Sequence, residues 1–168
     1  MKNTNLLATF IAVLGFMSIG AHAYNGPTRC SIRAFDGHYL SAVQGGGLTR
    51  DPVSTVATRV GANELFTLVD SRSGSSNIEY GIRTSRGFYL TAVGGGGRGF
   101  DAIHADAVRL QNWEKFRFIS LGMGLYAIQT LSGNYLTAQD SGGRTNDVLH
   151  TNATRIGTWE KFRLKCGL

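Results

Sequence analysis

Two short segments share one arrangement that is suited to binding sugars: Trp113-Glu114-Lys115 and Trp159-Glu160-Lys161. An indole face packs against the C–H face of a sugar ring while its N–H stays available for a hydrogen bond. The carboxylate and the ammonium group beside it can bond sugar hydroxyls. A third copy, Asn63-Glu64-Leu65, lacks the aromatic side chain. We therefore expect two strong ligand-binding sites, at the two tryptophans, and a weaker, degenerate one at Asn63 and Glu64.

The residues that follow these segments indicate where the tryptophans point. Phe116 and Phe118 follow the first segment, and the equivalent positions of the other copies are also apolar. In a β-strand, alternate side chains face opposite sides, so phenylalanines on the core side would place Trp113 outward with Lys115. Trp159 would point outward in the same way. The alternative is that each tryptophan caps one end of the fold or covers a neighbouring loop.

The glutamates Glu64, Glu114 and Glu160 recur in all three copies, in phase with the core phenylalanines. A carboxylate that points inward needs hydrogen-bond partners. Two roles are open: the glutamates bond backbone amides where the repeats join, or they accept sugar hydroxyls beside the tryptophans.

Two further sets of polar residues recur: the aspartates Asp51, Asp101 and Asp147, and the histidines His104 and His150. The aspartates follow glycine turns, so an Asx-type turn bond explains them, with sugar or calcium contact as the alternative. We expect the histidines to be surface residues of strands, because threefold symmetry would hold them apart. No nucleophile with a paired base is visible. We expect a non-catalytic protein with no cofactor and no metal.

A threefold repeat must position these residues. The Trp-Glu-Lys-Phe motif recurs after 46 residues (162 − 116), and its weaker echo lies 50 residues earlier (116 − 66). A second motif, Gly-x-Tyr-Leu-x-Ala, begins at Gly37, Gly87 and Gly133, with the same two intervals. Two motifs that share unequal spacings define three repeats, within about 24–70, 71–120 and 121–168.

The pattern of each repeat predicts four short strands. Tyr-Leu-x-Ala alternates as a strand does, and a glycine-rich hairpin turn follows it. The third strands are expected at 53–57, 103–107 and 149–153, and the Trp-Glu-Lys-Phe strand closes each unit. Since one unit cannot bury its own apolar face, three must close together. The sequence predicts an all-β protein with no helix.

The first 23 residues have the features of a signal peptide. An apolar run from Leu6 to Met17 follows Lys2, and Ala21-His22-Ala23 is a small-x-small cleavage site. The mature chain, 24–168, would form one domain with a net charge of +5 (16 − 11). Its basic residues are scattered, so we expect no nucleic-acid partner and, after cleavage, no membrane association. The protein would be secreted or periplasmic.

The two cysteines agree with export. Cys30 lies near the mature start and Cys166 near the end. An even pair in an exported chain indicates a disulfide, which would join the first strand to the last.

The full set of motifs, Gly-x-Tyr-Leu-x-Ala, a glycine hairpin and Trp-Glu-x-Phe in three copies, resembles the fascin-like (actin-cross-linking-like) β-trefoil family. The resemblance covers the mature chain. It implies a six-stranded barrel capped by three hairpins, with pseudo-threefold symmetry. Exported single-trefoil members bind polysaccharides, particularly β-glucans, at up to three pockets. It therefore implies a monomeric, lectin-like module for a polysaccharide or glycan. The alternative is a protein-interaction trefoil that binds actin, as fascins do, or a secreted effector.

Overall fold

The computed structural model describes residues 28–71 and 79–168, so the predicted signal peptide lies outside the described residues. Four strands belong to each repeat: β1 (Thr28–Arg33), β2 (Tyr39–Ala42), β3 (Val53–Ala57) and β4 (Leu65–Asp70); β5 (Glu79–Arg83), β6 (Tyr89–Ala92), β7 (Ile103–Ala107) and β8 (Lys115–Gly122); β9 (Leu125–Thr130), β10 (Tyr135–Ala138), β11 (Leu149–Ala153) and β12 (Phe162–Cys166). Short 3-10 turns interrupt them: η1 (Val43–Gly45), η2 (Ala62–Glu64), η3 (Val93–Gly95), η4 (Asn112–Glu114) and η5 (Gln139–Ser141). Within the described ranges, no helix has the length and apolar character to cross a membrane.

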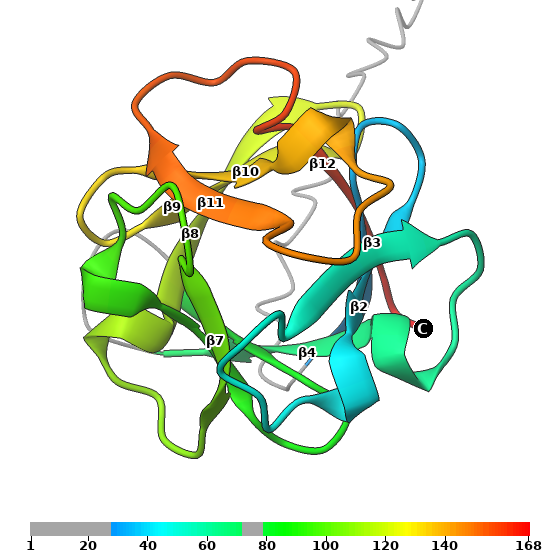
Figure 1. Cartoon of the computed structure of the whole chain (residues 1–168). Helices are drawn as coiled ribbons and strands as arrows, with labels where there is room; N and C mark the ends of the chain where they lie inside the picture. Colours follow the sequence, from blue (N-terminus) through cyan, green and yellow to red (C-terminus); the bar gives the residue numbers. More distant parts are fainter. Residues whose placement is uncertain (1–27, 72–78) are drawn as a thin grey trace, which may run out of the picture.

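Six of the strands close into a barrel. Antiparallel pairing runs from β1 to β4, β5, β8, β9, β12 and back to β1. The other strands form three hairpins, β2–β3, β6–β7 and β10–β11, which surround the pseudo-threefold axis in Figure 1. This is a β-trefoil, so the predicted fold class and the three third strands are confirmed. Closure removes exposed barrel edges, which is why three units are needed.

The repeated apolar residues form the core. Phe66, Phe116 and Phe162 come from the same position in each repeat and are fully buried. The leucines of the Gly-x-Tyr-Leu motif are also buried: Leu40, Leu90 and Leu136. The three repeats therefore share one hydrophobic core, to which each contributes equivalent side chains.

The glycine hairpin turns join each repeat to the next. Gly47 donates its backbone N–H to the carbonyl of Ala105 (2.7 Å), and Gly97 donates to Thr151 (2.7 Å). Gly143 closes the ring by donating to Thr55 in the first repeat (2.8 Å). These glycines have φ values of +94°, +84° and +76°. Residues other than glycine rarely adopt such φ values, so the turns need glycine to reach the neighbouring strand.

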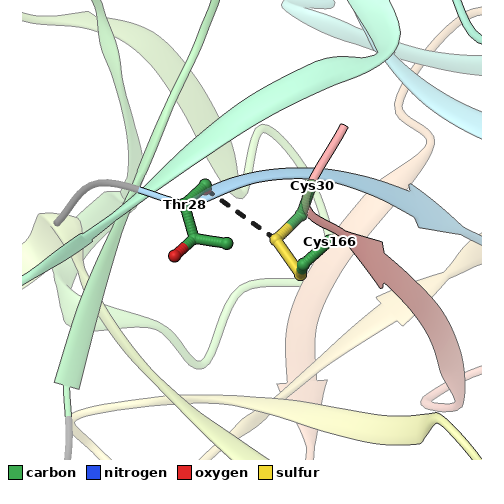
Figure 2. Close-up of a disulfide and its surroundings, with 3 residues drawn as sticks. All are labelled: Thr28, Cys30 and Cys166. Carbon is green, nitrogen blue, oxygen red and sulfur yellow. Dashed lines mark hydrogen bonds between the residues drawn. A yellow bond between two sulfur atoms is a disulfide. The ribbon is translucent and has the colours of Figure 1, made fainter. Parts of the chain in front are cut away.

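The predicted disulfide is present. Cys30 in β1 and Cys166 in β12 are cross-strand partners, and their sulfurs are bonded (Figure 2). The chain itself connects β4 to β5 and β8 to β9, whereas β12 and β1 are the two ends. The bridge is therefore the third covalent connection between neighbouring repeats, since it joins the third repeat to the first. Disulfides of this kind are typical of proteins outside the reducing cytoplasm.

Candidate ligand-binding site

The tryptophans lie in turns, which corrects the predicted strand. Trp113 is the middle residue of η4, and β8 begins only at Lys115. Trp159 lies in an equivalent turn before β12, which begins at Phe162. Strand alternation therefore does not set their orientation. The turn sets the orientation of each indole, because the glutamate that follows the tryptophan is buried and the tryptophan before it stays at the surface.

Both indoles are accessible. Trp113 is 52% exposed and Trp159 is 40% exposed, so a large part of each ring is available to a ligand. Residues 110–115 line a surface depression of about 530 Å³ around Trp113. The N–H edge of this indole lies beside the hairpin turn of its own repeat, where a Cβ on Gly95 would stand 3.4 Å from Nε1. Trp113 is thus supported along one edge while its ring remains exposed.

Buried glutamates hold these turns. Glu114 is only 6% exposed. Its Oε2 accepts the backbone N–H of Gln111 (2.9 Å), and its Oε1 accepts the hydroxyl of Thr91 in β6 (2.8 Å). The carboxylate therefore closes the turn that carries Trp113 and ties it to the neighbouring hairpin.

The third repeat has the same arrangement. Glu160 accepts the N–H of Gly157 (2.7 Å) and the hydroxyl of Thr137 (2.8 Å). In the first repeat, Glu64 accepts the N–H of Gly61 (2.7 Å). Of the two roles left open, the contacts fit the bonding of backbone amides, but each amide lies three residues before its glutamate in the same turn and not where the repeats join. The turn is kept in all three repeats, including the one that lacks the indole.

The remaining predicted site residues lie on these turns or directly after them. Lys115 and Lys161 are partly buried and follow their glutamates directly, and Asn63 is exposed at the position of the missing indole. Within residues 28–71 and 79–168, neither lysine forms an ion pair with a carboxylate.

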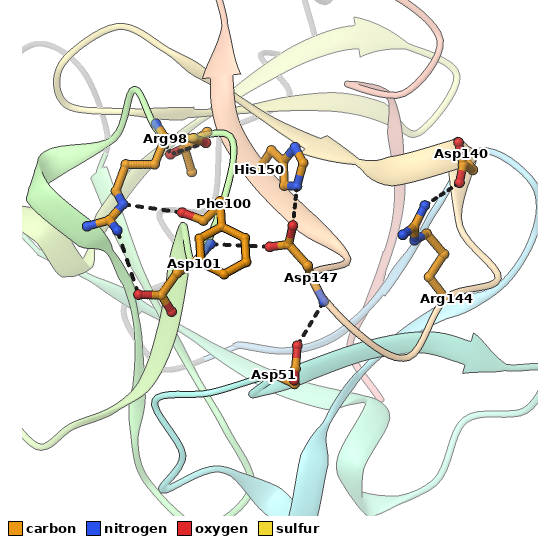
Figure 3. Close-up of polar contacts among 9 residues, drawn as sticks. Asp51, Arg98, Phe100, Asp101, Asp140, Arg144, Asp147 and His150 are labelled. Atoms are coloured by element: carbon orange, nitrogen blue, oxygen red, sulfur yellow. Dashed lines mark hydrogen bonds and ion pairs between the residues drawn. The ribbon is translucent and has the colours of Figure 1, made fainter.

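The repeated aspartates make two contacts between repeats, and the bonds their carboxylates form among the described residues are not the predicted Asx-type turn bonds. Asp147 donates its backbone N–H to Oδ1 of Asp51 (2.8 Å), and Asp101 donates to Oδ1 of Asp147 (3.2 Å; Figure 3). His104 and His150 pair through Nε2 with the aspartate of their own repeat (3.2 and 2.9 Å). The two aspartate bonds run between repeats because the three turns meet at the pseudo-threefold axis. Within the described chain, no group of three His, Cys, Asp or Glu residues is placed to hold a metal.

The same axis carries a pocket that the sequence reasoning missed. It measures about 470 Å³ and is lined by residues 49–53, 100–104 and 146–149. A signal was present in the sequence, since the residues before the repeated aspartates differ completely: Arg50, Phe100 and Asn146.

Comparisons with known proteins agree with the fold. No family model matches the sequence, and no curated protein matches it. Among solved structures, the designed threefold-symmetric protein ThreeFoil has a TM-score of 0.68 at 17% identity, covering 81% of this chain and 96% of its own. The Rhizoctonia solani agglutinin has a TM-score of 0.66 at 12% identity, covering 83% and 94%. SeviL, solved bound to asialo-GM1 saccharide, has a TM-score of 0.61 at 11% identity, covering 85% and 100%. At such identities the likeness establishes a single β-trefoil and nothing finer.

Proposed function

We propose that this protein is an exported, non-catalytic, carbohydrate-binding β-trefoil whose principal sites are the turns of Trp113 and Trp159. The observation that carries the proposal is the pair of exposed indoles at equivalent positions, 52% and 40% accessible. Large aromatic rings left in water on a small protein favour a ligand with an apolar face. The disulfide between Cys30 and Cys166 supports export.

Each residue of a site has a separate role. The indole of Trp113 or Trp159 stacks on a sugar ring, and Lys115 or Lys161 donates to its hydroxyls. The glutamates act as positioning residues, because their oxygens already accept bonds from the turn and the adjacent hairpin. A turn held in this way loses little entropy when a ligand binds, which favours affinity.

The first repeat should bind weakly. Its turn is retained by Glu64, but Asn63 offers no stacking surface. The protein is then effectively bivalent, and both sites belong to one rigid body. Two weak contacts to a repetitive polymer reinforce each other, since the second is intramolecular. A polysaccharide, with β-glucan as the first to test, is therefore a better ligand than a free monosaccharide.

The similar structures support this proposal. An agglutinin and a protein solved with a saccharide share the fold. A non-catalytic role is supported by the glutamates, whose oxygens are engaged in protein hydrogen bonds and so are poorly placed to transfer protons to a glycosidic bond.

Affinity electrophoresis against a panel of soluble polysaccharides tests the proposal. We expect retardation by at least one neutral polymer, with no release of reducing sugar on prolonged incubation. A protein that migrates unchanged through every polymer but sediments with actin filaments would instead be a protein-interaction trefoil. Detectable release of reducing sugar would contradict the non-catalytic assignment.

A further inference from the structure

The pocket on the pseudo-threefold axis has the properties of a separate ligand site. Equivalent residues from all three repeats line it, so it occurs once per molecule. Its volume of about 470 Å³ falls within the range of small-molecule sites, roughly 300–1,000 Å³. It lies among the hairpin turns and shares no lining residue with the depression around Trp113.

The floor of this axial pocket is apolar. Its residues are almost fully buried and come in equivalent sets from the three repeats: Pro52, Val53, Ala102, Ile103, Val148 and Leu149. A concave apolar floor with a few polar groups above it is the usual composition of a ligand site.

The rim is asymmetric although the floor is symmetric. Where the three repeats reach the mouth of the pocket, they place a guanidinium, a phenyl ring and an amide: Arg50, Phe100 and Asn146. Phe100 is 70% exposed. Figure 3 shows it close to Asp101 and Asp147, at the edge of the axial turns. An exposed ring beside hydrogen-bonding groups can stack on one face of a sugar while those groups bond its hydroxyls.

The carboxylates at the axis are mostly occupied by the protein itself. Asp147 accepts from the N–H of Asp101 and from His150, and Asp101 contacts His104 and Arg98. Asp51 accepts only the N–H of Asp147 within the described residues, which leaves one of its oxygens to accept a ligand hydroxyl. The three carboxylates outnumber the one guanidinium that lines the pocket, that of Arg50, so the pocket disfavours an anionic ligand.

We propose that the axial pocket binds one neutral, hexose-sized sugar residue, independently of the two tryptophan sites. Phe100 stacks on the ring, Arg50 and Asn146 donate to hydroxyls, and Asp51 accepts from one. The pocket opens to solvent at its rim, so a free hexose or the end of a chain can enter it. The exposed indoles, in contrast, can contact the interior of a polymer. The molecule would thus recognise both a chain and its terminus.

The test uses a Trp113→Ala/Trp159→Ala background, so that the tryptophan sites cannot contribute. Backbone amide NMR spectra are compared with and without glucose, galactose, mannose or N-acetylglucosamine at about 50 mM, enough to fill a millimolar site. We expect at least one sugar to shift the amides of residues 49–51, 100–102 and 146–148 along a single saturation curve. The uronic acid of the same sugar should bind at least about tenfold more weakly.

Two variants in this background complete the test. Phe100→Ala should abolish the shifts, and because that ring is already exposed, its removal leaves the fold intact. Phe35→Ala removes another exposed ring that does not line the pocket and should change nothing. The proposal is wrong if no neutral sugar shifts these amides, if the uronic acid binds equally well, or if Phe100→Ala leaves the shifts unchanged. If the axial pocket binds no sugar but the parent protein still binds polysaccharide, the axial proposal fails and the proposal for the tryptophan sites stands.

Discussion

Reduction of the Cys30–Cys166 bridge should lower the free energy of unfolding by several kcal/mol, on the order of the cost of truncating a buried core side chain. The two cysteines are separated by 136 residues, so the bridge closes nearly the whole described chain. In the chain-entropy treatment, a loop of this length contributes about 5 kcal/mol by restricting the unfolded state. Residual structure in the unfolded chain lowers the value, so we expect about 3–5 kcal/mol.

The native fold should survive reduction. The β1–β12 ladder pairs four residues on each strand, and those hydrogen bonds do not depend on the bridge. A loss of this size corresponds to a decrease of about 10–20 °C in Tm for a domain of this length.

Thermal unfolding followed by circular dichroism, with and without a phosphine reductant, measures the change. The Cys30→Ala/Cys166→Ala variant is the matched control, since its Tm should be low and should not respond to reductant. Equal Tm values for oxidised and reduced protein, within about 2 °C, would refute the reasoning. Two titratable thiols in the untreated native protein would refute it as well.

Three further changes have expected outcomes. Gly96→Ala should destabilise the fold by about 1–3 kcal/mol in urea titrations, because a Cβ there would lie 2.7 Å from Oγ1 of Thr130 and φ is +113°; an unchanged midpoint would contradict this close approach. Glu114→Ala should lower the free energy of unfolding by about 1–3 kcal/mol, since it leaves a buried hydroxyl and a turn N–H unpaired. In a Trp159→Ala background it should also weaken polysaccharide retention, which a purely stabilising residue would not do. Burial, with a smaller contribution from Asp70, raises the pKa of Tyr80 above its usual 10.0. The unfolded state therefore ionises first, and the stability that this tyrosine contributes is lost as pH rises above about 10. Ultraviolet absorbance titration detects the late ionisation, and Tyr80→Phe should remove it.

The sequence predicts the fold well because the three copies carry the same apolar pattern. Phe66, Phe116 and Phe162 recur at the intervals of the hairpin motif, and only a closed threefold arrangement buries them together. The third strand of each repeat begins and ends where alternation predicts it. The disulfide was predictable for the same reason, since closure brings the first strand beside the last.

The local geometry of the tryptophan sites was not predictable from alternation. A three-residue 3-10 turn is too short to show a period, so the segment Trp113-Glu114 reads as the start of the following strand. Exposure of the indole and burial of the glutamate follow equally from a turn and from a strand. The sequence pattern therefore does not distinguish them.

The contacts at the axis depend on closure of the whole chain. The aspartate pairs are 46 and 96 residues apart, and no local pattern indicates that they meet. The asymmetric rim could have been found by comparing the repeats position by position. Arg50, Phe100 and Asn146 are a set that differs while the next residue is always aspartate.

Polysaccharide retention by tryptophan variants tests the central claim most directly. Trp113→Ala and Trp159→Ala are each expected to weaken retention on affinity gels, by about 2 kcal/mol or more per lost anchor, and the double variant should lose nearly all of its retention, because only chain ends remain for the axial pocket. Asn63→Ala is the matched control and should behave as the parent protein does. Circular dichroism and an unchanged Tm confirm that the variants are folded, as expected for rings that are 52% and 40% exposed. If the folded double variant is retained as strongly as the parent, the tryptophans are structural caps and do not form the binding sites.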